Sequence, residues 1–243
     1  GPAIQPGSRS YERSWIRDGS LTSSAMLRFG HPEVVRDFLR WFAPQVYANG
    51  KVPCCIDHRG ADPTPEHDSH GEFLWLLMEY WRHTGDTALL RETWPVARRT
   101  VAYMDSLRGA RLTPAYAGTE FEGLLPPSIS HEGYSAKPMH SYWDDFFAYR
   151  GYRDAVAMAR VLGQDIVATR WQAAADSFGR AITTTVARTM ARHGIAYVPG
   201  AADLGDFDAT STTVALTPTG AEALLPRTAL EATAVRCGIA RPE

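Results

Sequence analysis

The sequence predicts an all-α protein of about eight helices, and three observations support this fold class. Apolar residues recur mostly at spacings of three and four, which is the period of amphipathic helices. The strict alternation typical of strands is scarce. Tight turns marked by Gly or Pro alternate with long loops at residues 50–67, 108–140 and 194–206. In a ring of helical hairpins, tight turns would gather on one side and long loops would form the mouth of a central pocket.

Four helices are expected in the first half of the chain. They cover residues 21–29, 31–50, 70–86 and 87–107. Gly30 and Gly85 mark two of the ends, as glycine often does after a last helical turn. Pro44 should bend or interrupt the second helix, and Pro95 is a candidate break in the fourth, because proline removes a helical hydrogen bond.

Four more helices are expected in the second half, and the last two are shorter. They cover residues 141–163, 166–194, 207–216 and 227–238. The opening Gly-Pro resembles the remnant of a protease cleavage site, so residues 1–10 are interpreted as a cloning remnant with an N-terminal extension. Residues 11–243 then form one domain, since no repeat or low-complexity linker divides them.

Charge and composition argue against several classes of partner. The chain has 25 basic and 27 acidic residues and a net charge of -2, so no overall field favours nucleic acid or an anionic membrane. No apolar run reaches the roughly 18 residues of a membrane span, and no targeting segment is seen. Three cysteines cannot all pair, and the neighbours Cys54 and Cys55 seldom suit a mutual disulfide, so the cellular location stays open.

No cofactor or metal is expected. Glycine-rich phosphate signatures are absent, and no serine lies in a nucleophile elbow. A metal cluster could be written from His58, His67 and His70 with Asp57 and Asp68, but the histidines lack the i, i+4 spacing of a helical zinc site.

Four clusters place aspartate in or just before a first helical turn: "SWIRDGS", "PEHDSHGEF", "MHSYWDDFF" and "DLGDFDATSTT". Helix capping explains such residues without any function. Aromatic neighbours favour a second explanation, because sugar rings stack on flat apolar faces while their hydroxyl groups need polar partners. These neighbours are Trp15, Tyr142, Trp143, Phe146 and Phe147.

Asp144 and Asp145 should have different roles, since adjacent helical residues point about 100° apart. A carboxyl beside Trp143 and a second carboxylate has two reasons for a raised pKa, although a helix start opposes the rise. Such a group can donate a proton to a leaving oxygen. Arg17 and Asp18 could grip adjacent hydroxyl groups, or could form only a surface ion pair.

The order of the four clusters resembles the glucoamylase-like six-hairpin glycosidases, from about residue 11 onward, and the stretch around "YWDDFFAYRG" looks like bacterial members. The resemblance implies an (α/α)6 toroid of twelve helices that acts on carbohydrate. It implies that Asp144 is the general acid and that the Trp15, Arg17 and Asp18 motif lines a sugar subsite. With the residue-level analysis, the expected substrate-binding residues are Trp15, Arg17, Asp18, Asp68, His140, Trp143 and Asp145.

One departure from the family pattern concerns the catalytic base. Family members place it in a later hairpin, and eight helices correspond to about the second to the ninth of the ring. The toroid is therefore expected to be incomplete: a fragment, a ring completed by self-association or a partner chain, or a variant in which Glu132 or Asp208 acts as base. Turnover by the chain alone is expected to be poor, because losing one of two cooperating carboxylates removes orders of magnitude of rate.

The leading hypothesis is a glycoside hydrolase that uses acid-assisted attack of water, with inversion at the anomeric carbon. A non-catalytic carbohydrate-binding or assembly module that keeps the sugar subsite is one alternative. A sugar isomerase or epimerase that uses His131 and His140 as acid and base is another.

Overall fold

The computed structural model describes residues 1–5 and 12–238. Within them the fold is mostly helical, as predicted, with eight α-helices. These are α1 (Ile16–Arg28), α2 (Pro32–Phe42), α3 (Asp68–Thr84), α4 (Thr87–Gly109), α5 (Tyr142–Val161), α6 (Asp165–His193), α7 (Ala209–Leu216) and α8 (Arg227–Arg236). The shorter elements are the 3-10 helices η1 (Ala43–Gln45) and η2 (Glu222–Leu224) and the strands β1 (Ser14–Trp15), β2 (Cys55–Asp57) and β3 (Gly60–Ala61).

The observed helices differ from the expected ones in a few places. Helix α1 begins at Ile16, so Arg17 lies inside its first turn. Helix α2 ends before Pro44, which falls in η1, as the sequence predicts. Helix α4 continues through Pro95, whose missing N–H costs one helical hydrogen bond in a helix that also buries one face. Residues 6–10 of the expected N-terminal extension lie outside the described residues.

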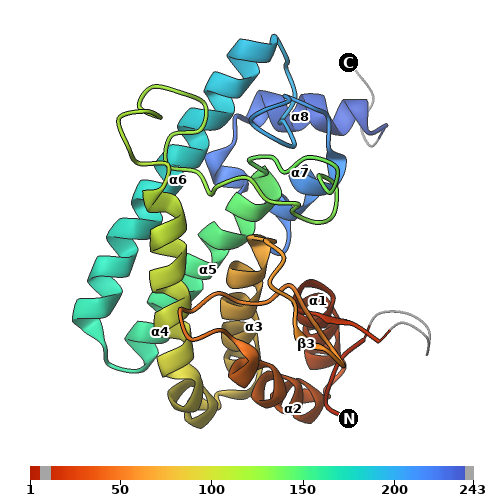
Figure 1. Ribbon diagram of the computed structural model, residues 1–243, viewed down its shortest axis with the longest axis vertical. Helices are drawn as coiled ribbons and strands as arrows, with labels where there is room; N and C mark the ends of the chain where they lie inside the picture. Colours follow the sequence, from red (N-terminus) through yellow and green to blue (C-terminus); the bar gives the residue numbers. More distant parts are fainter. Residues whose placement is uncertain (6–11, 239–243) are drawn as a thin grey trace.

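The helices form part of a ring of hairpins. Helices α1, α3, α5 and α7 are neighbours in that order, and α2, α4, α6 and α8 pack beside them (Figure 1). A cavity of about 350 Å³ is lined by Leu21 of α1, Trp75 of α3, Arg150 of α5 and Thr217 at the end of α7. Because α1, α3, α5 and the residue that follows α7 line one cavity, we call these four helices the inner helices of a partial toroid.

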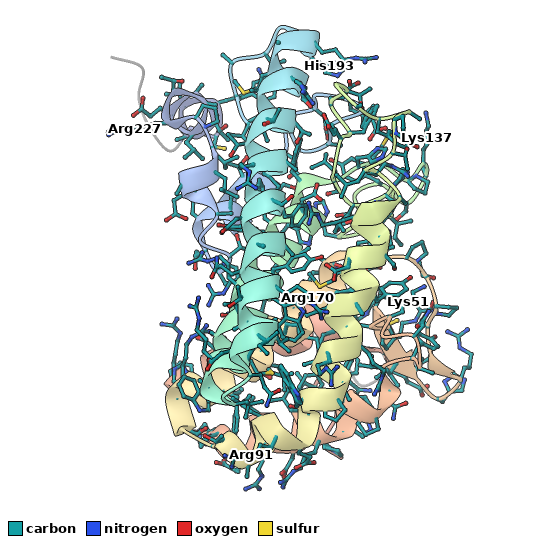
Figure 2. All side chains as sticks on the ribbon, turned by 90° about the vertical axis from the view of Figure 1, so that its left-hand side faces the viewer. Lys51, Arg91, Lys137, Arg170, His193 and Arg227 are labelled. Carbon is teal, nitrogen blue, oxygen red and sulfur yellow. The ribbon has the colours of Figure 1, made fainter. Side chains whose placement is uncertain are left out.

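A small antiparallel sheet is formed by β1, which precedes α1, and by β2 and β3, which lie between α2 and α3. Strand β1 pairs with β2 through Trp15 and Cys55, and β2 pairs with β3 through Asp57 and Gly60. The sheet therefore fixes the loop after α2 to the start of α1. Figure 2 shows Lys51 and Lys137, from two of the long loops, on the same side of the molecule. None of the described helices is both long and apolar enough to traverse a lipid bilayer.

Helices α3 and α5 approach each other backbone to backbone. A Cβ placed on Gly71 of α3 would lie 2.0 Å from the carbonyl oxygen of Phe147, and one on Gly151 of α5 would lie 2.7 Å from the Cα of Gly71. No side chain fits between the two helices here. Asp68 and Asp144 stand one helical turn before Gly71 and Phe147, so this contact fixes the distance between the starts of α3 and α5.

We expect Gly71→Ala to destabilise the protein by about 3 kcal/mol or more, since the added methyl group meets backbone rather than a movable side chain. Gly109→Ala is the matched control, because a Cβ at this last residue of α4 meets nothing within 4 Å. It should change stability by no more than about 1 kcal/mol. Urea unfolding measures both variants, and equal stabilities would contradict the close approach of α3 and α5.

Candidate active site

One carboxylate oxygen joins the first turns of three inner helices. Asp68, the first residue of α3, places its Oδ2 atom 3.3 Å from the Arg17 guanidinium of α1. The Trp143 indole N–H of α5 donates to the same oxygen at 2.8 Å. Asp68, Arg17 and Trp143, which the sequence analysis selected from three separate clusters, therefore meet at one place.

Arg17 is the cation at the centre of an acidic group. Its guanidinium lies 2.9 Å from Glu66, and it also lies over the Trp15 ring, 5.3 Å from the centroid. Burial alone would lower the pKa of Arg17, but the charges of Asp68, Glu72 and Glu66 raise it. Arg17 thus pairs with Glu66 and Asp68, whereas the alternative considered from the sequence was a surface pair with Asp18. Asp18 itself is partly exposed in the first turn of α1.

Glu66 and Glu72 belong to this site, although the sequence analysis missed them. Both are buried, and neither oxygen of Glu72 has a hydrogen-bond partner among the described residues. Burial raises the pKa of each, the Asp68 charge adds to the rise, and Arg17 opposes it; the pKa of Glu66 reaches about 9. The only sequence signal was the i, i+4 spacing of Asp68 and Glu72 on one helix face.

Asp144 lies beneath the loop between α4 and α5. It is 0% exposed, and it accepts hydrogen bonds from the Ser128 hydroxyl at 2.5 Å and the Ser130 hydroxyl at 2.8 Å. Burial raises its pKa to about 7, with a further contribution from the Asp68 charge, while the two serine hydroxyls oppose the rise. The expected direction of the shift is found, and the carboxylate that contributes most to it is Asp68 of α3.

Asp145 makes contacts different from those of its neighbour. Its Oδ1 atom accepts the Leu125 N–H at 3.0 Å, and its Oδ2 atom has no partner among the described residues. Burial raises its pKa, followed by the Asp144 charge, while the Leu125 N–H and Arg108 oppose the rise. Asp145 therefore ties α5 to the loop before it, and its role in binding substrate stays a prediction.

His131 connects this group to the fourth inner helix. Its ring stacks on Trp143 with centroids 4.7 Å apart, its Nδ1 atom lies 3.2 Å from the Ser130 hydroxyl, and its Nε2 atom lies 3.2 Å from Asp208. Asp208 caps α7 by accepting the N–H of Ser211 and that of the residue before it. Burial would raise the pKa of Asp208, but hydrogen bonds from His131 and Ser211 lower it to about 2.

His140 holds two long loops together. Its Nε2 atom accepts a hydrogen bond from Arg111 at 2.9 Å, its Nδ1 atom lies 3.2 Å from Asp203, and its ring stacks on Phe121. Both ring nitrogens are therefore engaged within the protein. These interactions do not test the prediction that His140 binds substrate.

The loop over Asp144 carries a left-handed backbone at two residues. Ser130 has φ of 55° and Glu132 has φ of 67°, and they are the non-glycine residues with positive φ in the described part of the chain. Such conformations cost about 1–3 kcal/mol each and persist where surrounding contacts enforce them. The Glu132 side chain is exposed, in contrast to the buried Asp144 below it.

The histidines of the hypothetical metal cluster do not form one group, although the rings of His67 and His70 lie 6.1 Å apart. His58 is exposed and pairs with Glu12. His67 and His70 are buried, and burial lowers their pKa values to about 3 and about 4. The Nδ1 atom of His70 lies 3.1 Å from the carbonyl oxygen of His67. These contacts are those of neutral core histidines.

Comparison with known proteins gives one family and a shared fold. Residues 10–218 match the model of the bacterial alpha-L-rhamnosidase 6 hairpin glycosidase domain. No curated protein sequence matches the chain. Among solved structures, a wild-type glycosidase is 16% identical with a TM-score of 0.63, covering 97% of this chain and 64% of its own.

Two further structures are similar. A glycosidase variant in complex with glucose is 16% identical with a TM-score of 0.51, over 74% of this chain and 50% of its own. A rhamnosidase from Klebsiella oxytoca with rhamnose bound is 18% identical with a TM-score of 0.61, over 98% of this chain and 48% of its own. At these identities the likeness concerns the fold, and this chain spans less than two thirds of each of these relatives.

We expect two substitutions to move the pKa of Asp144 in opposite directions. Asp68→Asn removes a neighbouring negative charge and should lower it, whereas Ser128→Ala removes a hydrogen bond to the ionised carboxylate and should raise it. Carbon-13 NMR titration of the Asp144 carboxyl group measures both shifts. Asp37→Asn, at an exposed position of α2, is the control and should leave the titration unchanged. Shifts of the same sign in both variants would contradict the assigned contacts.

Asp144 should also make stability depend on pH. Its pKa is raised from 3.8 to about 7 in the folded state, so its contribution is fully present below about pH 4 and is lost as the pH rises through about 7. Asp144→Asn removes this loss. The difference in unfolding free energy between the variant and the wild type should therefore shift in favour of the variant by up to about 4 kcal/mol from pH 4 to pH 8. Urea unfolding at both pH values tests this, and a pH-independent difference would contradict it.

Proposed function

This chain belongs to the bacterial alpha-L-rhamnosidase 6 hairpin glycosidase domain family, and we propose that it hydrolyses glycosides with Asp144 as the proton donor. The observation that carries the proposal is a buried carboxyl group whose pKa is raised to about 7. A glycosidase acid must hold its proton near neutral pH and release it to the leaving oxygen. Burial and the Asp68 charge supply that property to Asp144.

The proton of Asp144 has a route toward solvent. The Ser130 hydroxyl contacts both the Asp144 carboxyl group, at 2.8 Å, and the Nδ1 atom of His131, at 3.2 Å. A hydroxyl group accepts one proton while donating another, so it can pass a proton along such a chain. The His131 side chain is 15% exposed, whereas Asp144 is 0% exposed. We therefore propose that Asp144 delivers its proton through Ser130 and His131, or directly when the loop that covers it moves aside.

The sugar is proposed to bind where the inner helices begin. Arg17, His131 and Asp208 have side chains 13%, 15% and 18% exposed, and they offer both donors and acceptors to hydroxyl groups. The tryptophans Trp15 and Trp143 lie under Arg17 and His131 and hold them in place. The remaining predicted substrate-binding residues are proposed to support this surface: Asp18, Asp68, His140 and Asp145.

Hydrolysis is favoured over isomerisation by the state of His140. An isomerase that pairs His131 with His140 needs both imidazoles free to exchange protons with substrate. The ring nitrogens of His140 are engaged with Arg111 and Asp203. Inversion at the anomeric carbon remains part of the proposal, as does completion of the ring by further helices, because the family description names six hairpins and the described residues form four.

We expect the Asp144→Asn variant to respond to the leaving group of the substrate. On aryl glycosides with a poorly acidic phenol, kcat/KM should fall by about 10²–10⁴-fold, because the leaving oxygen then needs a proton. On dinitrophenyl glycosides the loss should be small, since that phenolate departs unprotonated. The full natural chain is assayed on aryl α-L-rhamnosides and on both anomers of aryl glucosides.

The matched control is Asp145→Asn, the neighbouring buried carboxyl group, which should not change the dependence on leaving group even where it lowers stability. In the wild type, the alkaline limb of the pH profile should lie near pH 7, because the acid must be protonated. A uniform loss across all leaving groups in Asp144→Asn would show that Asp144 is not the acid. If Glu132→Gln lowers activity with this dependence on leaving group and Asp144→Asn does not, the acid is the exposed Glu132 carboxyl group.

A further inference from the structure

Three potential metal ligands lie together at the open end of the β2–β3 hairpin. The Sγ atoms of Cys54 and Cys55 are 3.6 Å apart, and both thiols are buried. One ligand atom from each of Cys54, Cys55 and Asp62 lies within 4.8 Å of the others. The histidine cluster considered from the sequence has no part in this group.

The separation of the two sulfur atoms suits a shared cation. Zinc binds thiolate sulfur at about 2.3 Å, which places two sulfur atoms of a tetrahedral site about 3.8 Å apart. A disulfide needs about 2.05 Å, and adjacent cysteines rarely reach it. The observed distance of 3.6 Å between the two Sγ atoms is thus close to the distance between two sulfur ligands of a tetrahedral zinc site.

The hairpin holds the three ligands in place before any cation binds. The N–H of Asp62 donates to the carbonyl oxygen of Cys55 at 2.9 Å, so the residue after β3 returns beside the first residue of β2. The Asp62 carboxylate is oriented by the Thr64 N–H, which donates to its Oδ1 atom at 2.9 Å. A site built on strands loses less entropy on binding than one assembled from flexible loops.

Arg13 supplies the positive charge near these groups. Its guanidinium lies 3.9 Å from the Cys55 sulfur, 3.8 Å from Asp62 and 3.6 Å from Asp57. The Arg13 side chain is 35% exposed, so it can turn toward solvent while it keeps its contact with Asp57.

We propose that Cys54, Cys55 and Asp62 bind a thiophilic divalent cation of the zinc class, with water in the fourth position. The site would join β2 to the end of β3 and hold Cys55 opposite Trp15 in the sheet. Trp15 packs against both cysteines and stands two residues before Arg17. The cation would therefore stabilise the segment that brings Arg17 to Asp68, and this role is independent of the reaction proposed above.

Titration of chelator-treated protein with Co²⁺ and Zn²⁺ tests the proposal. We expect one ion per chain, with the thiolate charge-transfer absorption and the intense visible bands of tetrahedral Co²⁺. Cys54→Ser and Cys55→Ser should each weaken binding by more than about 100-fold, and Asp62→Asn by about 10-fold. Cys237→Ser is the matched control, since this third cysteine lies outside the site, and it should bind like wild type.

A second measurement uses the wild-type protein, so its result does not depend on whether a variant folds. Thiol alkylation is followed by peptide mass spectrometry, with and without Zn²⁺. Zn²⁺ should slow the labelling of Cys54 and Cys55 and leave Cys237 unchanged. Equal labelling rates with and without Zn²⁺, binding that survives in both serine variants, one ion shared by two chains, or a purified chain lighter by two hydrogen atoms because the pair is a disulfide would each overturn the proposal.

Discussion

The contact between Asp68, Arg17 and Trp143 is the interaction on which the site depends. A single buried carboxylate oxygen accepts hydrogen bonds from α1 and α5 at the start of α3. Removing one partner of a buried ion pair leaves a charge without compensation, which costs about 3–5 kcal/mol, so the loss of either Arg17 or Asp68 alone would be strongly destabilising. Helix N-termini also favour carboxylates through their dipoles, which explains why acidic residues can gather at this end of the ring.

The close contact between α3 and α5 affects the pKa values of the buried carboxyl groups near the Asp68–Arg17 pair. Gly71 meets the backbone of Phe147 one turn after Asp68 and Asp144, which lets the starts of α3 and α5 lie close together. Arg17 offers one positive charge to several buried acids, and the excess negative charge has to be relieved by binding protons. Burial is the main cause of the raised pKa values of Asp144 and Glu66, and the charge of the nearby Asp68 adds to it.

The sequence was sufficient to predict the helical fold and the six-hairpin glycosidase superfamily, and the four clusters that it indicated lie at the starts of neighbouring inner helices. It could not show that Glu66 and Glu72 are buried, because helical periodicity does not distinguish a charged face turned to solvent from one turned to another helix start. It predicted that Asp144 and Asp145 diverge, but which of them faces Asp68 depends on the crossing of α3 and α5. The narrower likeness to glucoamylases stays a prediction, since the matching family is of the rhamnosidase type.

The loop over Asp144 determines where the acidic proton can reside. An ionised carboxylate accepts from Ser128 and Ser130 together, but a protonated carboxyl group must donate on one side, so one of these hydrogen bonds has to reverse. The Ser128 oxygen already accepts the Ser130 N–H at 2.7 Å and is the more constrained of the two. The Ser130 hydroxyl has His131 beside it as a new acceptor when it turns from donor to acceptor toward Asp144. The proton is therefore best placed on the oxygen that faces Ser130, which is also the side that leads to the partly exposed imidazole of His131.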